Sequence, residues 1–288
     1  FNGILVGSHK VEIKKDGYGT DSKTVSILEG QTASLLGVLT TNASSSVASG
    51  ASSSGNTITI PVKDGISIDM VRVEAGTFTM GATAEMKDPW NVEKPTHQVT
   101  LTNDYYMGKY EVTQALWQAV MGNNPSNYKG DNLPVECVSW DDCQKFISEL
   151  NRITGKTFRI PTEAEWEYAA RGGKKSRGYQ YSGSNNLSDV AWYSDNSGKK
   201  THAVGTKQPN ELGIYDMSGN VEEWCQDWYG NYSSSSQTNP TGANSGYVRV
   251  IRGECWASYA WRCRSSFRNY GAPGEDAAGL GLRLVFSE

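Results

Sequence analysis

The sequence predicts an α+β fold, with helices early in its main domain and short strands with long irregular loops after them. Two observations support this prediction. Apolar residues recur at helical spacing in three segments between residues 113 and 172. Beyond Gly172, short runs of β-forming residues alternate with Gly, Asn and Ser turns, and aromatic residues are frequent. This order of elements favours helices packed beside a sheet over alternating β-α-β units.

The first helix is predicted to begin after Thr113, whose hydroxyl is a good N-cap, and to end at Gly122. Its core-facing side chains fall on one helical face, namely Leu116, Trp117, Val120 and Met121. Met121 is followed directly by the glycine, so the helix is short.

The second helix starts with a capping signature, because Ser139 is followed three residues later by Asp142, and it ends at Gly155. Its apolar face has the spacing i, i+3, i+4, i+7 in Cys143, Phe146, Ile147 and Leu150.

The third helix follows Pro161, with Thr162 and Glu165 as a capping box and with Trp166 and Ala169 facing inward. Glu163, Glu165 and Glu167 could be offered as paired catalytic carboxylates. We prefer a structural interpretation, since acids in a first helical turn complement the helix dipole.

Three parts are expected along the chain. Residues 1–41 form a small β-unit, in which the alternating segments around Val11 and Val25 flank a turn at Asp16-Gly17. Residues 42–56 consist largely of Ser, Ala, Gly and Asn, a composition typical of a flexible linker. Residues 57–288 form the main domain. The first part weakly resembles the surface-associated β-repeats named for a Pro-Glu-Gly-Ala motif.

Composition excludes several classes of function. The net charge of −4 does not favour a nucleic-acid surface. No apolar run approaches the ~20 residues of a membrane span. Five cysteines without a Cys-x-x-Cys pair, and three scattered histidines, favour neither a disulfide framework nor a zinc site. The chain begins at Phe1, which suggests a trimmed or mature fragment whose targeting signal is not visible.

Ordered motifs across the main domain resemble the formylglycine-generating-enzyme, or sulfatase-modifying-factor, family. The most specific run is Arg-Ile-Pro-Thr-Glu-Ala-Glu-Trp-Glu-Tyr-Ala-Ala-Arg-Gly at 159–172, and the others lie at 76–81, 110–113, 124–125, 134–140, 216–224 and 281–285. The resemblance covers residues 67–286. It implies a C-type-lectin-like fold with two or three helices, a twisted antiparallel sheet and much irregular loop.

The enzymes of this family oxidise a substrate cysteine with two cysteines near the C-terminus that hold copper(I). Here the corresponding residues depart from that pattern. Cys255 and Cys263 lie eight residues apart, further than in the enzymes, and Cys263 stands where non-catalytic relatives keep a packed core cysteine. Ser258 and Ala260 lie near the catalytic positions. We therefore expect no copper and no enzyme activity, with copper-dependent oxidation of a sulfatase cysteine as the alternative. A second alternative is a structural surface protein with a degenerate site.

The C-terminal segment is most similar to the variable proteins of diversity-generating retroelements, which share this fold. In those proteins, error-prone reverse transcription rewrites chosen codons in the last strands and loops. The framework around Trp256 and Arg268 matches the family, while the residues between do not. The resemblance implies a binding surface made of Glu254, Cys255, Ala257, Ser258, Tyr259, Trp261, Arg262, Tyr270, Gly271, Ala272 and Glu275.

Such a surface is chemically suited to binding. Tyr and Trp provide large contact area at low entropic cost, and Arg262 and Glu275 add charge. We expect Trp256 to pack in the core and Trp261 to be exposed, and an exposed Cys255 would be reactive. The expected ligand is a protein or a surface glycan, and we expect a monomer at a cell surface or outside the cell.

A calcium site is also implied by the resemblance. Asp216, Gly219, Val221 and Glu223 occupy the positions of a family calcium loop, and oxygen ligands suit Ca²⁺. The alternative is an empty turn in which Asn220 bonds its own backbone.

Overall fold

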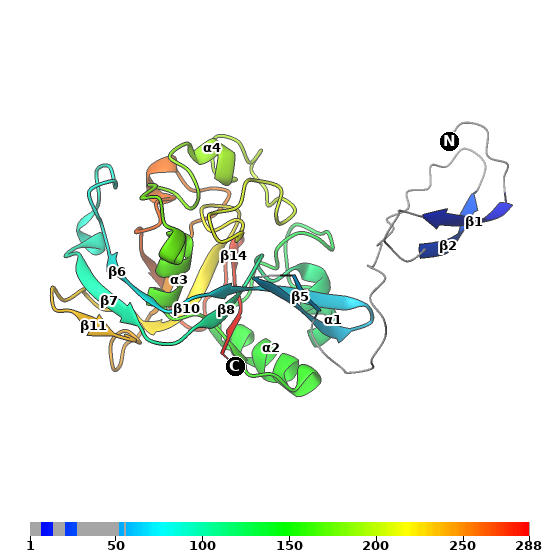
Figure 1. The fold of residues 1–288 in the computed structure, drawn as a ribbon, viewed down its shortest axis with the longest axis horizontal. Coiled ribbons are helices and arrows are strands. Elements are labelled where there is room, and N and C mark those ends of the chain that lie inside the picture. Colours follow the sequence, from blue (N-terminus) through cyan, green and yellow to red (C-terminus); the bar gives the residue numbers. More distant parts are fainter. Residues whose placement is uncertain (1–6, 14–20, 28–51, 55, 288) are drawn as a thin grey trace. The chain divides into compact units, whose positions relative to one another are not determined.

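The computed structural model describes residues 7–13, 21–27, 52–54 and 56–287 (Figure 1). The chain divides into two compact units, Phe1–Gly50 and Ala51–Glu288. In the first unit, β1 (Gly7–Ile13) pairs antiparallel with β2 (Asp21–Ile27). These strands coincide with the alternating segments of the sequence. The turn expected at Asp16-Gly17 lies outside the described residues.

The second unit contains three sheets (Figure 1). The largest has the strand order β3-β4-β5-β8-β15-β9. Its strands are β3 (Ser52–Ser54), β4 (Thr57–Lys63), β5 (Ile66–Val73), β8 (Tyr105–Gly108), β15 (Val285–Phe286) and β9 (Phe158–Arg159). The end of the chain thus returns to this sheet, where β15 lies between β8 and the edge strand β9 and pairs antiparallel with both.

Two smaller sheets complete the unit. One has the order β11-β7-β6, made of β11 (Gln237–Thr238), β7 (His97–Leu101) and β6 (Gly76–Met80). The other has the order β13-β12-β10-β14, made of β13 (Asn269–Gly271), β12 (Arg249–Arg252), β10 (Glu222–Trp228) and β14 (Leu280–Gly281). This last sheet carries the C-terminal loops.

Within the segment expected to be a linker, Ser52–Ser54 form β3 and pair antiparallel with β4, and the second unit begins at Ala51. Serine-rich composition predicted a linker through residue 56, because local composition does not report that a neighbouring strand edge accepts three more residues.

The three predicted helices are confirmed, and their ends match the capping residues. α1 (Gln114–Met121) begins after Thr113 and ends at Gly122, which has a φ of 76°. α2 (Trp140–Thr154) ends at Gly155, and α3 (Glu163–Ala170) is opened by the capping box of Thr162 and Glu165. Positive φ is cheap only for glycine, which explains both glycine stops.

Four single-turn elements were not predicted. They are α4 (Leu187–Val190), η1 (Asn91–Glu93), η2 (Gly173–Lys175) and η3 (Ala260–Arg262). One turn is too short to display a helical period, so the pattern has no signal for them.

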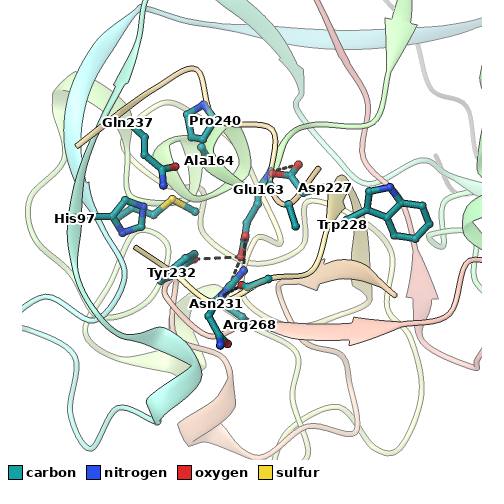
Figure 2. A pocket seen from close by; sticks show the side chains of 14 residues that line it. His97, Glu163, Ala164, Asp227, Trp228, Asn231, Tyr232, Gln237, Pro240 and Arg268 are labelled. Atoms are coloured by element: carbon teal, nitrogen blue, oxygen red, sulfur yellow. Dashed lines mark hydrogen bonds and ion pairs between the residues drawn. The ribbon is translucent and has the colours of Figure 1, made fainter. Parts of the chain in front are cut away.

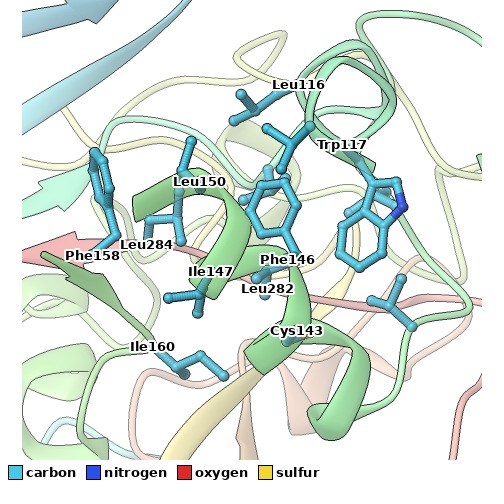
Figure 3. Close-up of a cluster of buried hydrophobic side chains, with 14 of the residues drawn as sticks. Leu116, Trp117, Cys143, Phe146, Ile147, Leu150, Phe158, Ile160, Leu282 and Leu284 are labelled. Carbon is cyan, nitrogen blue, oxygen red and sulfur yellow. The ribbon is translucent and has the colours of Figure 1, made fainter. Parts of the chain in front are cut away.

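The core beneath α1 and α2 is formed by the predicted apolar faces (Figure 3). Phe146 stacks on Trp117 with ring centroids 4.8 Å apart and planes 6° apart. Leu282 and Leu284, which lie between β14 and β15, pack into the same cluster. The last strand segment is therefore anchored in the core, which holds the preceding C-terminal loops in place.

Candidate functional site

Two C-terminal loops leave the sheet that contains β12 and β13. The first, residues 253–268, joins β12 to β13, and the second, residues 272–279, joins β13 to β14. Together they contain nearly all the residues that the sequence assigned to a binding surface. We call these segments the display loops.

Buried ion pairs fix the display loops to the rest of the unit. Four buried arginines of the C-terminal segment pair with buried glutamates at 2.6–2.7 Å: Arg252 with Glu167, Arg264 with Glu93, Arg268 with Glu163 and Arg283 with Glu223. Arg252 also pairs with Glu163, at 3.1 Å. A buried pair costs desolvation, but breaking it leaves an uncompensated charge, so these pairs specify how the loops sit.

Arg252 shows how an ion pair positions the backbone. Besides its bond to Glu167, its guanidinium donates to the carbonyl oxygen of Ser265 at 2.6 Å and to that of Ser266 at 3.3 Å. The backbone of the first display loop at residues 265 and 266 is therefore held by the Arg252 guanidinium.

These pairs also refine the interpretation of the α3 acids. Glu165 caps the helix and pairs with Arg159, as a structural role requires. Glu163 and Glu167 are buried rather than solvated near the helix end. Glu163 pairs with Arg268 of the first display loop, and Glu167 pairs with Arg252 at the end of β12. The partners of these ion pairs lie 85 to 105 residues apart, so a local sequence pattern does not predict them.

Several of the predicted surface residues point outward. Tyr259 is 65% exposed, Tyr270 54% and Trp261 38%. Ala257 and Glu275 are also exposed, while Arg262 and Ala272 are half-buried. Exposure of Trp261 confirms that part of the expectation.

Four predicted surface residues are buried instead, which corrects the assignment. They are Glu254, Cys255, Ser258 and Gly271. The Ser258 hydroxyl donates to Glu254 at 2.6 Å and accepts from the backbone amide of Cys255 at 3.1 Å. This local network folds the start of the first display loop inward.

The space around Gly271 leaves no room for a side chain. A Cβ at this position would lie 3.0 Å from the Trp224 ring and 3.1 Å from Ile251. Such contacts are tighter than normal packing, so any side chain at Gly271 would have to displace the core beneath β13.

Two carboxyl groups lie together below the display loops. Burial and the neighbouring Glu222 raise the pKa of Glu254 to about 7, while Ser258 and Arg262 oppose that shift. Arg262 approaches Glu254 at 3.2 Å. The charge of Glu254, beneath the first display loop, therefore changes close to neutral pH.

Trp90, outside the C-terminal segment, belongs to the same surface. It is 52% exposed and stacks on Trp261 with centroids 4.7 Å apart. Its backbone amide donates to Glu93 at 2.7 Å, the same glutamate that pairs with Arg264. No local pattern connects residue 90 with residue 261, because this contact depends on the tertiary fold alone.

Trp256 was expected in the core and is only half-buried. Its ring meets Tyr128 edge to face at 5.7 Å, and its indole N–H has no hydrogen-bond partner among the described residues.

All five cysteines lie in the described residues and are free. Cys255 is buried rather than exposed, and burial together with Glu222 raises the pKa of its thiol to about 11. Burial also holds the pKa of Cys263 well above its usual range. Without a metal, both groups are therefore protonated thiols at neutral pH, and neither is an activated nucleophile.

Alkylation tests the state of Cys255. We expect iodoacetamide to label it at pH 7.5 at least about tenfold more slowly in the folded protein than in urea, and faster as the pH approaches 11. Peptide mass spectrometry after timed labelling measures both rates. Rapid, selective labelling of folded Cys255 would show an activated cysteine and would contradict this result.

The expected calcium loop has a different bonding pattern. Both carboxylate oxygens of Glu223 accept from Arg283 at 2.6–3.0 Å, and one also accepts from the Trp166 indole at 2.7 Å. Asp216 accepts from the Gly205 amide at 2.7 Å. A divalent cation at Glu223 would face the Arg283 guanidinium, while Oδ1 of Asp216 is buried without a hydrogen-bond partner among the described residues.

The alternative for this turn, in which Asn220 bonds its own backbone, differs from the structure. The Asn220 amide bonds Glu111 and the backbone of His202 rather than its own backbone. Gly219, with a φ of 99°, lets the chain pass close to the Trp192 carbonyl. Val221 donates its amide to Glu111. Among the described residues, no group of three or more His, Cys, Asp or Glu side chains is arranged to hold a metal ion.

Comparison with known proteins identifies the family. The sulfatase-modifying factor enzyme 1-like domain matches residues 64–288, and the chain belongs to this family. The chaperone protein LppX of Paenibacillus barcinonensis is 36% identical over 295 residues, which cover 83% of this chain and 94% of that protein. The formylglycine-generating enzyme of Mus musculus is 29% identical over 287 residues, which cover 75% of this chain and 74% of the enzyme.

A solved structure supports the same conclusion. Treponema denticola variable protein 1 superposes with a TM-score of 0.74 and 32% identity, and the match covers 82% of this chain and 100% of that protein. The α+β fold of the formylglycine-generating-enzyme type is thus confirmed. Relatives include proteins named as enzymes and one named as a variable protein, so family membership alone does not decide between catalysis and binding. Within the described residues, no helix is both long and apolar enough to span a membrane.

Proposed function

We propose that the second unit is a non-catalytic ligand-binding domain whose exposed display-loop residues, together with Trp90, form the binding surface. The observation that carries this proposal is that exposed side chains and a fixed backbone occur in the same loops. Exposed aromatics such as Tyr259 and Trp261 sit on a backbone that buried ion pairs hold in place. A rigid backbone with variable, exposed aromatic side chains is how binding loops gain affinity without loss of fold.

The likeness to Treponema denticola variable protein 1 supports a further part of the proposal. We infer that the codons for the exposed display-loop residues differ between copies of this gene. The codons for the buried framework arginines stay the same. The partner would be a protein or a surface glycan met at a cell surface. The exposed set is narrower than the sequence suggested, since it omits Glu254, Cys255, Ser258 and Gly271.

The thiol-oxidase alternative has a specific similarity in its favour, namely the match to formylglycine-generating enzymes. It requires two thiolates at the active site. The raised pKa values of Cys255 and Cys263 oppose this requirement. Oxygen consumption with copper and a cysteine-containing peptide distinguishes the two functions. Turnover that disappears in Cys255→Ser would overturn the binding proposal.

A pair of libraries tests the binding proposal directly. One library randomises the exposed residues Tyr259, Trp261, Tyr270 and Glu275, and the matched control randomises the buried residues Glu254, Cys255, Ser258 and Gly271. We expect most members of the first to fold and to yield binders against an immobilised test protein. We expect most members of the second to be lost before selection. Equal survival of both libraries, or no binders from the first, would contradict the proposal.

Single substitutions give the same contrast quantitatively. Tyr259→Ala is expected to change the free energy of unfolding by less than about 0.5 kcal/mol, because the ring is mostly exposed. Ser258→Val should cost about 1–3 kcal/mol, since it leaves Glu254 without its hydroxyl donor. Urea unfolding followed by tryptophan fluorescence measures both changes. A loss at Tyr259 as large as that at Ser258 would show that the exposed loop is part of the framework.

A further inference from the structure

A separate cavity of about 130 Å³ lies beside α3, at the end of β10. Figure 2 shows side chains from several elements around it, including His97 at the start of β7, Gln237 in β11 and Asp227 in β10. Arg268 and Tyr232 also line it. The exposed display-loop residues do not line this cavity, so it requires its own explanation.

Asp227 presents an unused polar atom there. One carboxyl oxygen accepts from the backbone amide of Glu163 at 2.9 Å. No hydrogen bond joins the other oxygen to a described residue, and Asp227 lines the cavity. That oxygen is therefore available to a water or a ligand in the cavity.

His97 presents a second unused polar atom. Its Nδ1 lies 3.3 Å from the carbonyl oxygen of Pro95, so this nitrogen carries the proton and Nε2 is left as an acceptor. The ring packs on Tyr232 with centroids 4.8 Å apart, which fixes its orientation. Nε2 has no partner in the described part of the chain. Gln237 adds an amide that can both donate and accept.

The charges around the cavity are compensated. Glu163 receives two bonds from Arg268, at 2.6 and 2.8 Å, and a third from Arg252 at 3.1 Å. Burial, with Glu163 as the next cause, raises the pKa of Asp227 to about 8. At pH 7 this acid is therefore mostly neutral, and its second oxygen carries a proton that it can donate. No unpaired charge remains to select an ion.

The size of the cavity limits the ligand. A single water needs about 10–15 Å³ of such space, whereas cavities of about 150 Å³ hold a six-membered ring. A volume of about 130 Å³ suits a small polyol or one end of a sugar ring. Apolar wall residues such as Met80, Ala164 and Pro240 provide contacts for its carbon atoms.

We propose that this cavity binds a neutral polyhydroxylated molecule, with one hydroxyl accepting from Asp227 and another donating to His97. A hydroxyl group both donates and accepts, so a polyol satisfies the two unpartnered atoms without bringing charge. This site is independent of the variable surface proposed above. The same chemistry could come from a free polyol or from a terminal sugar residue.

Ligand-observed NMR on the full chain tests the proposal with three probes, namely glycerol, methyl glucoside and methylammonium. Preferential binding of glycerol identifies a free polyol as the source, and preferential binding of methyl glucoside identifies a sugar residue. Either result supports the site. Binding of methylammonium alone, or of no probe at millimolar concentration, would overturn it.

Two variants separate the roles of the polar groups. His97→Phe keeps the ring against Tyr232 and removes the acceptor, so affinity for the polyol should fall about tenfold, as expected for one lost hydrogen bond in a buried site. Asp227→Asn keeps both an acceptor for the Glu163 amide and a donor toward the cavity, so binding should change less than about threefold. An ammonium ligand would lose its partner in Asp227→Asn. Gln237→Ala, at a half-buried position, provides a second variant should His97→Phe fail to fold, and it should also weaken binding.

The pH profile gives a further readout. Wild-type affinity for the polyol should decline as the pH rises through about 8, because the Asp227 proton is lost, whereas Asp227→Asn should show no such decline. The ionisable groups that act on Asp227 are Glu163, Glu165, Arg268, Arg249, Arg159 and Cys225. A pH profile shared by wild type and Asp227→Asn would assign the change to one of these and would overturn the donor role of Asp227.

Discussion

Replacing Glu93 with glutamine is expected to destabilise the second unit by about 3–5 kcal/mol, the usual effect of removing one partner of a buried ion pair. Glu93 is fully buried and receives bonds from Arg264 at 2.6 Å and from Ser266 at 2.5 Å. Glutamine leaves the Arg264 guanidinium buried and unpaired. Urea unfolding measured by tryptophan fluorescence reports this change for the second unit alone, because all nine tryptophans lie beyond residue 51.

A matched control uses an exposed pair of the same chemistry. Glu149→Gln removes the partner of Arg152 on the surface of α2, where the pair is solvated, and it should cost far less stability than Glu93→Gln. Arg264 and Ser266 hold the pKa of Glu93 below its usual range. The stability that Glu93 contributes is therefore present at neutral pH and lost as the pH falls through its folded-state pKa. Comparable losses in Glu93→Gln and Glu149→Gln would refute the role of the buried pair.

The second large effect is expected in the core. Phe146→Ala should destabilise the unit by about 3–5 kcal/mol, because the side chain is fully buried and its removal leaves a cavity beside Trp117 (Figure 3). The same unfolding assay measures it. Tyr247→Ala is the control, since that ring is 94% exposed and its loss should lie within about 0.5 kcal/mol. A cost below about 1 kcal/mol at Phe146 would mean that α2 is not packed as described.

The two predictions bear on function as well as stability. Glu93 holds both Trp90 and Arg264, so its loss should loosen the exposed aromatics before it abolishes the fold. Phe146 stacks on Trp117 in the core beneath α1 and α2. A binding defect in Glu93→Gln at temperatures where the protein is still folded would therefore assign the loop geometry to the ion pair.

Local interactions explain what the sequence predicted well. The three helices start at capping side chains and two of them stop at glycines, and both signals act within a few residues. The apolar spacing of α2 correctly identified its buried face. The family's motifs could also be recognised in the sequence, because they are contiguous runs such as residues 159–172.

The display loops were predicted only in part because they have no periodic pattern. Tyr259 and Ser258 are adjacent, yet one is exposed and the other is buried. The difference arises from the bond between Ser258 and Glu254 and from the turn of the backbone, where Glu254 has a φ of 62°. A sequence pattern can place both residues in one loop, but it cannot say which side chain turns inward.

The sequence by itself determined the helices, the family and the region in which the exposed aromatics lie, because capping, spacing and contiguous motifs are local properties of the chain. The tertiary structure alone decided which display-loop residues face solvent and that Trp90 stands beside Trp261. It also decided that Glu93 pairs with Arg264, 171 residues away in the chain. These contacts depend on how distant segments pack, and burial then sets whether a carboxylate or a thiol is charged.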